Sequence, residues 1–216
     1  MGNLVITVGR EFGSGGRTVA KLVAEHFGIK CYDKNILALA AEKSGLNEKF
    51  IESYDEKAVS GLGFLTGQGF YFSPRGANND IHVEAYFSQF NVIRELAKKE
   101  SCVIVGRAGN YILRDEPGMI SVFISADRAD RVDRIMKYEK ISDRQAEKAI
   151  DKYDKNRAKY YNFFSNMKWG EAKTYDLCIN SSKLGIEGAA KIVIDYVEAR
   201  LKAEADKNSG KTRLTV

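Results

Sequence analysis

The sequence has few of the residues that build metal centres or disulfide frameworks. Its 216 residues include three cysteines and two histidines. The cysteines are odd in number and scattered in or beside apolar segments, which predicts buried free thiols in a reducing compartment. The histidines have no metal-ligand spacing with the cysteines. A disulfide-stapled domain and a Cys/His zinc site are therefore not expected at Cys31, Cys102, Cys178, His26 and His82.

Long apolar runs are also lacking. No apolar stretch approaches the roughly 20 residues that a helix needs to cross a bilayer. The first residues have neither the basic region nor the long apolar run of a secretory signal. We therefore expect a cytoplasmic protein without a membrane segment.

The charge is mildly basic, at +5, and no dense Lys/Arg block accompanies it. A nucleic-acid partner would rest on that net charge alone, so none is expected. Phosphate-bearing small substrates also require positive charge, and several arginines stand beside the motif positions described below. We therefore favour a small-molecule nucleotide or other acceptor as the partner. The sequence leaves both a monomer and a homodimer open.

Short apolar runs alternate with segments of helical periodicity. Runs rich in β-branched and apolar residues predict strands at residues 4–8, 29–32, 102–105, 119–124 and 177–180. Apolar residues at helical spacing predict helices between them, most clearly at residues 82–99, 142–163 and 186–201. This alternation is typical of an α/β doubly wound fold.

The chain length and the 44% content of hydrophobic residues suit one core, which predicts a single domain over residues 1–203. Residues 60–80 carry many glycines with aromatic residues between them and predict a flexible insertion. Local packing of those rings is our favoured interpretation, and contact with a partner or a nucleotide base is the alternative. Residues 204–216 are polar and aperiodic, which predicts a disordered tail.

A glycine-rich turn follows the first predicted strand and leads into a helix. Such a turn can bind anions, because backbone N–H groups point inward and the helix N-terminus carries partial positive charge. Residues 11–18 align with the phosphate-loop pattern G-x-x-x-x-G-K-[ST], in which the final hydroxyl binds Mg²⁺. We predict a nucleotide-phosphate cradle, with Thr18 as the metal ligand, formed by Gly13, Ser14, Gly15, Gly16, Arg17 and Thr18.

Two positions depart from the common pattern. Glu11 replaces the opening glycine, and Arg17 replaces the lysine. Arginine keeps the positive charge but binds phosphate through a planar fork, so the geometry changes. The alternative interpretation is a glycine-rich strand–helix turn that binds no ligand.

Several segments together resemble the cytidylate-kinase-like family of P-loop kinases, whose own loop carries Gly-Gly-Arg in place of Gly-Lys. The segments that carry this resemblance are residues 10–17, 31–34, 105–110, 125–131 and 175–180. The resemblance extends over residues 4–201, nearly the whole chain.

The resemblance implies a fold and an activity. The fold is α/β of the P-loop NTPase type, with three α/β/α layers, a central five-stranded parallel sheet and a helical lid near residues 137–168. The activity is an ATP- and Mg²⁺-dependent phosphotransferase that moves the γ-phosphoryl group to a small acceptor. Candidate acceptors are (d)CMP and other nucleoside monophosphates.

Arg107 directly follows a predicted strand, at the position where ligands bind in open α/β sheets. Phosphoryl transfer depends on positioning and charge neutralisation, which suits arginine. The resemblance implies a catalytic and substrate-binding role for Arg107, and the alternative is a surface salt bridge. In cytidylate kinases an Asp follows this Gly-Arg pair, whereas Ala108 stands here, a departure that weakens the case for CMP.

Further arginines lie in the region of the expected lid. Arg128 and Arg131 are spaced to share a helix face. By resemblance, Arg128 is predicted to bind substrate, and Arg131 and Arg157 are predicted to be catalytic. Asp154 and Arg157 match the Asp-x-x-Arg spacing of such lids. For each of these arginines the alternative is a solvated helix face.

Two more residues complete the predicted site. Arg17 is predicted to be catalytic as well as part of the phosphate cradle. Asp33 follows the second predicted strand, and the resemblance places it near the acceptor or the metal. The equally weighted alternative for Asp33 is an N-cap of the following helix.

A second function remains open at this point. Arg17 departs from the common P-loop pattern, and Ala108 stands where cytidylate kinases have an Asp, so the chain could be a nucleotide-binding regulatory module without kinase turnover.

Overall fold

The computed structural model describes residues 2–45 and 77–208. Most of the glycine-aromatic segment predicted at residues 60–80 therefore lies outside the described residues, as does the predicted tail beyond residue 208. Within the described part of the chain, no helix is both long enough and apolar enough to span a membrane.

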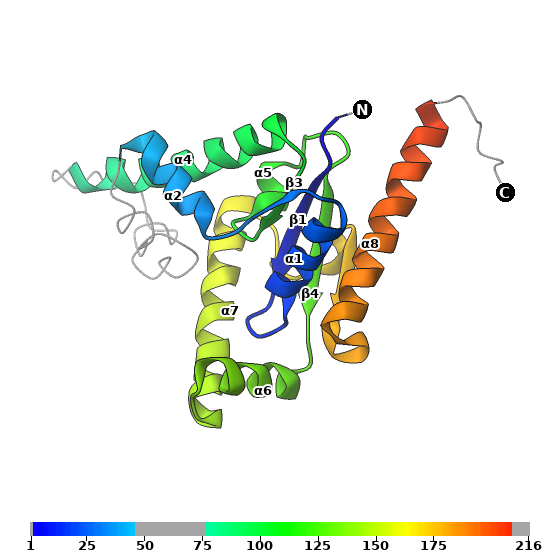
Figure 1. Cartoon of the computed structure of the whole chain (residues 1–216). Helices are drawn as coiled ribbons and strands as arrows, with labels where there is room; N and C mark the ends of the chain where they lie inside the picture. Colours follow the sequence, from blue (N-terminus) through cyan, green and yellow to red (C-terminus); the bar gives the residue numbers. More distant parts are fainter. Residues whose placement is uncertain (1, 46–76, 209–216) are drawn as a thin grey trace.

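One parallel sheet forms the centre of the molecule (Figure 1). Its five strands run in the order β2-β3-β1-β4-β5. β1 is central, and its residue Val8 pairs with Val105 of β3 and with Val122 of β4. The predicted five-stranded parallel sheet is confirmed. The strands are β1 (Val5–Arg10), β2 (Lys30–Tyr32), β3 (Cys102–Val105), β4 (Ile120–Ser125) and β5 (Leu177–Asn180).

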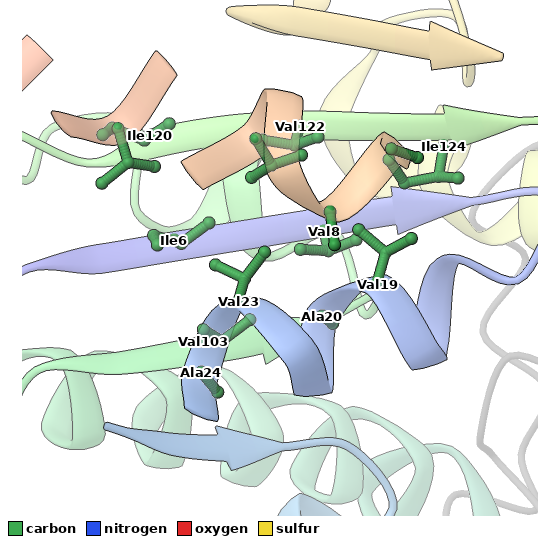
Figure 2. Close-up of a cluster of buried hydrophobic side chains, with 14 of the residues drawn as sticks. Ile6, Val8, Val19, Ala20, Val23, Ala24, Val103, Ile120, Val122 and Ile124 are labelled. Atoms are coloured by element: carbon green, nitrogen blue, oxygen red, sulfur yellow. The ribbon is translucent and has the colours of Figure 1, made fainter. Parts of the chain in front are cut away.

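Helices cover both faces of the sheet, because successive strand side chains point to opposite faces and both sets are apolar. Ile6 and Val103 face α1 and α8, with which they form the core drawn in Figure 2. Val5 and Ile104 face α2, α4 and α5. The result is the expected α/β/α arrangement. These helices are α1 (Gly16–His26), α2 (Asn35–Ser44), α4 (Ala77–Lys99), α5 (Gly109–Ile112) and α8 (Ser181–Asn208).

A helical hairpin stands at the carboxyl edge of the sheet. It consists of α6 (Arg128–Glu139) and α7 (Asp143–Ser165), which pack through Val132, Ile135, Ala146 and Ile150. A short 3-10 turn, η2 (Ala172–Thr174), then leads to β5. This hairpin corresponds to the lid region expected near residues 137–168.

Two short segments differ in secondary structure from the sequence predictions. Residues 77–80, predicted as part of the insertion, already belong to α4. Residues 204–208, predicted as disordered, continue α8, which contains a break at Gly185 with φ of 72° and ψ of 177°. Residues 201–208 are mostly strong helix formers, and extending an existing helix costs much less than starting one. The polar character of residues 204–208 therefore did not distinguish a helical segment from a disordered one.

The three cysteines are free, as predicted, but only Cys102 is buried. Cys31 is partly exposed and Cys178 is exposed. The prediction of three buried thiols was wrong for Cys31 and Cys178, because β2 and β5 lie at the two edges of the sheet, where a strand side chain can face solvent.

Thiol labelling tests this arrangement. Burial, with the Glu100 carboxylate adding to it, raises the pKa of Cys102 to about 12, so its thiol stays protonated and unreactive at pH 8. We expect Ellman's reagent to modify Cys178 first in the native protein and Cys102 only after denaturation. The control Cys178→Ser should lose the fastest phase. Rapid labelling of Cys102 in the native protein would contradict the fold.

Candidate functional site

A cavity of about 780 Å³ lies at the carboxyl edge of the sheet, between the start of α1 and the α6–α7 hairpin. The turn from β1 to α1 forms one wall of this cavity. Charged side chains from other elements form much of the rest, among them Lys21, Asp33, Lys34, Arg107, Glu139 and Arg157.

The β1–α1 turn has the backbone geometry of an anion-binding loop. Gly13 and Gly15 have φ of 81° and 78°, in the left-handed region that favours glycine. A Cβ atom at Gly16 would lie 2.5 Å from Cβ of Arg10, so only glycine fits there. Within residues 2–45 and 77–208, the N–H groups of Gly13, Gly15 and Arg17 have no hydrogen-bond acceptor. They are therefore available to an anion at the N-terminus of α1.

Ser14 differs from the other predicted cradle residues, because it is fully buried and does not line the cavity. Its hydroxyl donates to the Glu11 carbonyl at 2.9 Å and accepts from the Gly16 N–H at 3.3 Å. The Ser181 hydroxyl donates to the Ser14 carbonyl at 2.7 Å. The Ser14 side chain thus fixes the shape of the loop.

The residues present fit a nucleotide phosphate with Mg²⁺. The Thr18 hydroxyl and the Arg17 and Lys21 side chains line the cavity beside the available N–H groups. In the described part of the chain no cluster of three or more His, Cys, Asp or Glu could hold a metal alone. Proteins commonly bind Mg²⁺ through one or two side chains together with substrate phosphates and water, and Thr18 has a hydroxyl that could be such a ligand.

Arg17 and Asp33 form an ion pair, with Arg17 Nε 2.6 Å from Asp33 Oδ2. The Arg17 side chain is 51% exposed and that of Asp33 is 15% exposed. The alternative role for Asp33 was wrong, because the N-cap of α2 is Lys34 and no side chain caps that helix end. Asp33 instead places a carboxylate in the cavity wall, in contact with the arginine at the motif's lysine position.

Arg107 follows β3 and is only 2% exposed, yet it lines the cavity. Arg107 and Ala108 have φ of 51° and 52°, which is strained for residues other than glycine and costs about 1–3 kcal/mol each. Such strain occurs most often at functional sites. Ala108 packs against Tyr160 and Tyr161 in a small aromatic cluster. The position next to Arg107 is therefore apolar.

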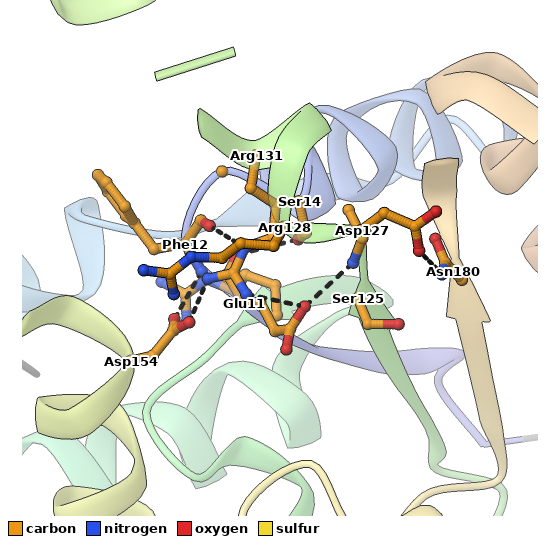
Figure 3. Close-up of polar contacts among 12 residues, drawn as sticks. Glu11, Phe12, Ser14, Ser125, Asp127, Arg128, Arg131, Asp154 and Asn180 are labelled. Carbon is orange, nitrogen blue, oxygen red and sulfur yellow. Dashed lines mark hydrogen bonds and ion pairs between the residues drawn. The ribbon is translucent and has the colours of Figure 1, made fainter. Parts of the chain in front are cut away.

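The three arginines predicted on the hairpin lie in three different settings. Arg157 lines the cavity, where its Nη1 donates to the Arg10 carbonyl at 3.2 Å. Arg131 is outside the cavity lining, and its guanidinium contacts the Glu11 and Asp154 carboxylates (Figure 3). Arg128 is also outside the lining. Arg131 and Arg128, predicted to be catalytic and substrate-binding respectively, therefore do not lie in the cavity wall.

Arg128 contacts Glu147 and Asp151 of α7. Its side chain is 43% exposed, so these ion pairs lie on the outer surface of the hairpin.

Sequence reasoning missed several cavity residues. Lys21 stands four residues after Arg17 on α1, and this spacing on one helix face could have indicated it. Tyr138, Glu139 and Tyr153 come from the hairpin, where the sequence offers no motif that marks them.

Comparison with known proteins agrees with this geometry. The model of the cytidylate kinase-like family matches residues 5–183. The chain is 28% identical to the cytidylate kinase of Pyrococcus horikoshii, with 90% of each chain covered. It is also 28% identical to the cytidylate kinase of Archaeoglobus fulgidus, with 90% of this chain and 95% of the relative covered.

A crystal structure of an uncharacterized protein from Eubacterium ventriosum has a TM-score of 0.68 and 33% sequence identity, and covers 91% of this chain and 99% of that chain. The chain is a phosphotransferase of the kinase type with a P-loop fold. It belongs to the cytidylate kinase-like family.

The Arg17–Asp33 contact leads to a binding prediction. Replacing Asp33 by Asn removes a negative charge that competes with phosphate for Arg17. We expect ATP, titrated calorimetrically in EDTA so that metal binding plays no part, to bind up to about fivefold more tightly, since an exposed ion pair is worth up to about 1 kcal/mol. Asp115→Asn, at an exposed position outside the cavity, controls for the change in net charge. Unchanged or weaker ATP binding would argue against this competition.

Proposed function

We propose that the chain transfers the γ-phosphoryl group of ATP to a small acceptor that itself carries phosphate or another anion. The observation that carries this proposal is the glycine loop at the start of α1, which has available N–H groups and lines the cavity. Arg and Lys side chains lie on the other walls of the same cavity. Phosphoryl transfer requires mainly positioning and charge neutralisation, and the loop N–H groups and the Arg and Lys side chains of the cavity can supply both.

The donor phosphates would lie on the loop. The N–H groups of Gly13, Gly15 and Arg17 would bind phosphate oxygens, and the Arg17 guanidinium would leave Asp33 to neutralise the outer phosphates. The Thr18 hydroxyl would hold Mg²⁺, which neutralises charge on the phosphates when bound. Lys21 adds a further positive charge on the same face of α1.

The acceptor would lie on the wall formed by Arg107, Lys34 and Arg157. The cavity lining includes six Arg or Lys side chains against three Asp or Glu side chains. Three of the six, Lys34, Arg107 and Arg157, lie outside β1, the glycine turn and α1, where they could meet a second anion. Arg107, buried and held by the turn after β3, would fix an acceptor anion facing the donor. (d)CMP and other nucleoside monophosphates remain the first acceptors to test, although Ala108 offers no carboxylate to a ribose or base.

The second candidate function is a regulatory module that binds nucleotide without turnover. The observation that favours it is the ion pair between Arg17 and Asp33. Arg17 stands at the motif's lysine position, and in this pair its guanidinium already contacts a carboxylate. Tight binding of ATP with no product from any acceptor would support this alternative over a kinase.

An activity assay tests the proposal. The purified protein with Mg²⁺ and ATP is incubated with a panel of nucleoside monophosphates and small phosphorylated metabolites. We expect ADP and a phosphorylated acceptor to form together. Failure to bind ATP at all would overturn both candidate functions.

Thr18→Ala tests the metal ligand. We expect the affinity for Mg²⁺-ATP, measured by calorimetry, to fall on the order of tenfold or more, because one oxygen ligand of the ion is lost. Affinity for ATP in EDTA should change little. Thr18→Ser, which keeps the hydroxyl, is the matched control and should behave like the wild type. Equal Mg²⁺-ATP affinity in the Ala and Ser variants would show that Thr18 does not bind the metal.

A further inference from the structure

The second residue of the phosphate loop is held on both sides of its backbone. The Phe12 N–H donates to Asp154 Oδ1 at 2.7 Å, and the Phe12 carbonyl accepts from Arg131 Nε at 2.7 Å. Arg131 comes from α6 and Asp154 from α7 (Figure 3). Each helix of the hairpin therefore makes one hydrogen bond to the same loop residue.

The two side chains that hold Phe12 also bind each other. Arg131 Nη2 contacts Asp154 Oδ2, and Arg131 Nη1 lies 3.3 Å from Glu11 Oε2. The Arg131 and Asp154 side chains are only 6% and 18% exposed. Glu11 Oε2 also accepts from the Ala126 N–H at 3.0 Å, between β4 and α6. These charged groups form a network centred on the nearly buried Arg131 guanidinium, with Glu11 25% exposed at the cavity wall, and charge-assisted hydrogen bonds strengthen as water is excluded.

The Phe12 ring adds an apolar contact to the same connection. It stacks on Tyr153 of α7, with ring centroids 4.3 Å apart and an interplanar angle of 26°. It also packs against the cluster formed by Val132, Ile135, Ala146 and Ile150 of the hairpin. The loop residue is thus part of the hairpin's own core.

We propose that Glu11, Arg131 and Asp154 form a latch that keeps the α6–α7 hairpin attached to the phosphate loop when no ligand is bound. Arg131 and Asp154 act as positioning residues, not as groups that touch the substrates. Arg157 lies three residues after Asp154, and its guanidinium is 5.7 Å from the centre of the Phe12 ring. The latch therefore sets the position of Arg157 in the cavity. Only this last, catalytic consequence rests on the proposed function.

The latch explains why Glu11 occupies the position of the opening glycine. A glycine there would leave Arg131 with one carboxylate and would leave the Ala126 N–H without this acceptor. The hairpin offers a natural comparison, because Arg128 also joins α6 to α7, through Glu147 and Asp151. That connection is more exposed and does not contact the loop. It links the same two helices without linking them to the phosphate loop.

Hydrogen exchange in the ligand-free protein tests the latch without requiring any activity. The measurement is the exchange rate of the Phe12 amide by NMR, in Asp154→Ala and in the matched control Glu147→Ala, which also removes a carboxylate from α7. We expect exchange on the order of tenfold faster in Asp154→Ala, because the amide loses its charged acceptor. Glu147→Ala should exchange like the wild type. Equal rates in the two variants would overturn the proposal.

A second variant keeps the test decisive if Asp154→Ala does not fold. Arg131→Lys keeps the charge but loses the Nε–H donor to the Phe12 carbonyl and the separate guanidinium nitrogens that contact Asp154 and Glu11. We expect faster exchange of the Phe12 amide in this variant as well. A Phe12 rate equal to that of the wild type in folded Arg131→Lys would overturn the latch.

Kinetics separates the latch from the proposed function. With an acceptor that is turned over, we expect Asp154→Ala to lower kcat by roughly 10- to 100-fold, since a misplaced catalytic group costs rate. Glu147→Ala should leave kcat unchanged. If no acceptor is turned over, the proposed function fails while the exchange experiment still decides on the latch. Accelerated exchange with unchanged kcat would keep the latch as a structural contact and overturn its role in placing Arg157.

Discussion

The parallel pairing of β1 with β3 and β4 is the constraint on which the site depends. Because Val8 lies level with Val105 and Val122, the segments that follow these strands emerge side by side at one edge. The Gly106 N–H donates to the Val8 carbonyl at 3.0 Å, and the Glu11 N–H donates to the Ile124 carbonyl at 3.0 Å. The ladder thus continues past the strand ends and fixes the glycine loop, the Arg107 turn and the start of α6 against one another.

Most of the fold could be predicted from the sequence, because each strand is a short apolar run and each helix has its own periodicity or cap. The helix predicted from residue 142 is α7, and at its start the Ser142 N–H donates to Gln145 Oε1 at 2.9 Å. The helical structure of residues 77–80 and 204–208 was not predictable in the same way. Polar residues that favour a helix and polar residues that favour a loop differ little in hydropathy, and the neighbouring structure decides between them.

Residues of the candidate site could be predicted where a single short segment of sequence defines them. The loop glycines and Thr18 follow from spacing alone, and Arg107 follows from its place after a strand. The contacts of the hairpin arginines were harder to predict. Their spacing shows that they share a helix, but it does not show which acidic side chain of the other helix each arginine contacts. Arg131 reaches Asp154 and the loop, whereas Arg128, one turn earlier, reaches Glu147 on the outside. Such a difference arises only from tertiary packing.

The contact between Glu11 and Arg131 also constrains how this sequence can change over generations. Replacing Glu11 by glycine would bring the loop nearer to the common pattern but would remove one of the two carboxylates around a guanidinium that is 6% exposed. Buried charges that lose a partner are costly, so the effects of changes at these two positions are not additive. A sequence change toward the common loop would have to alter both residues together, because either single substitution leaves a largely buried charged group with one partner fewer.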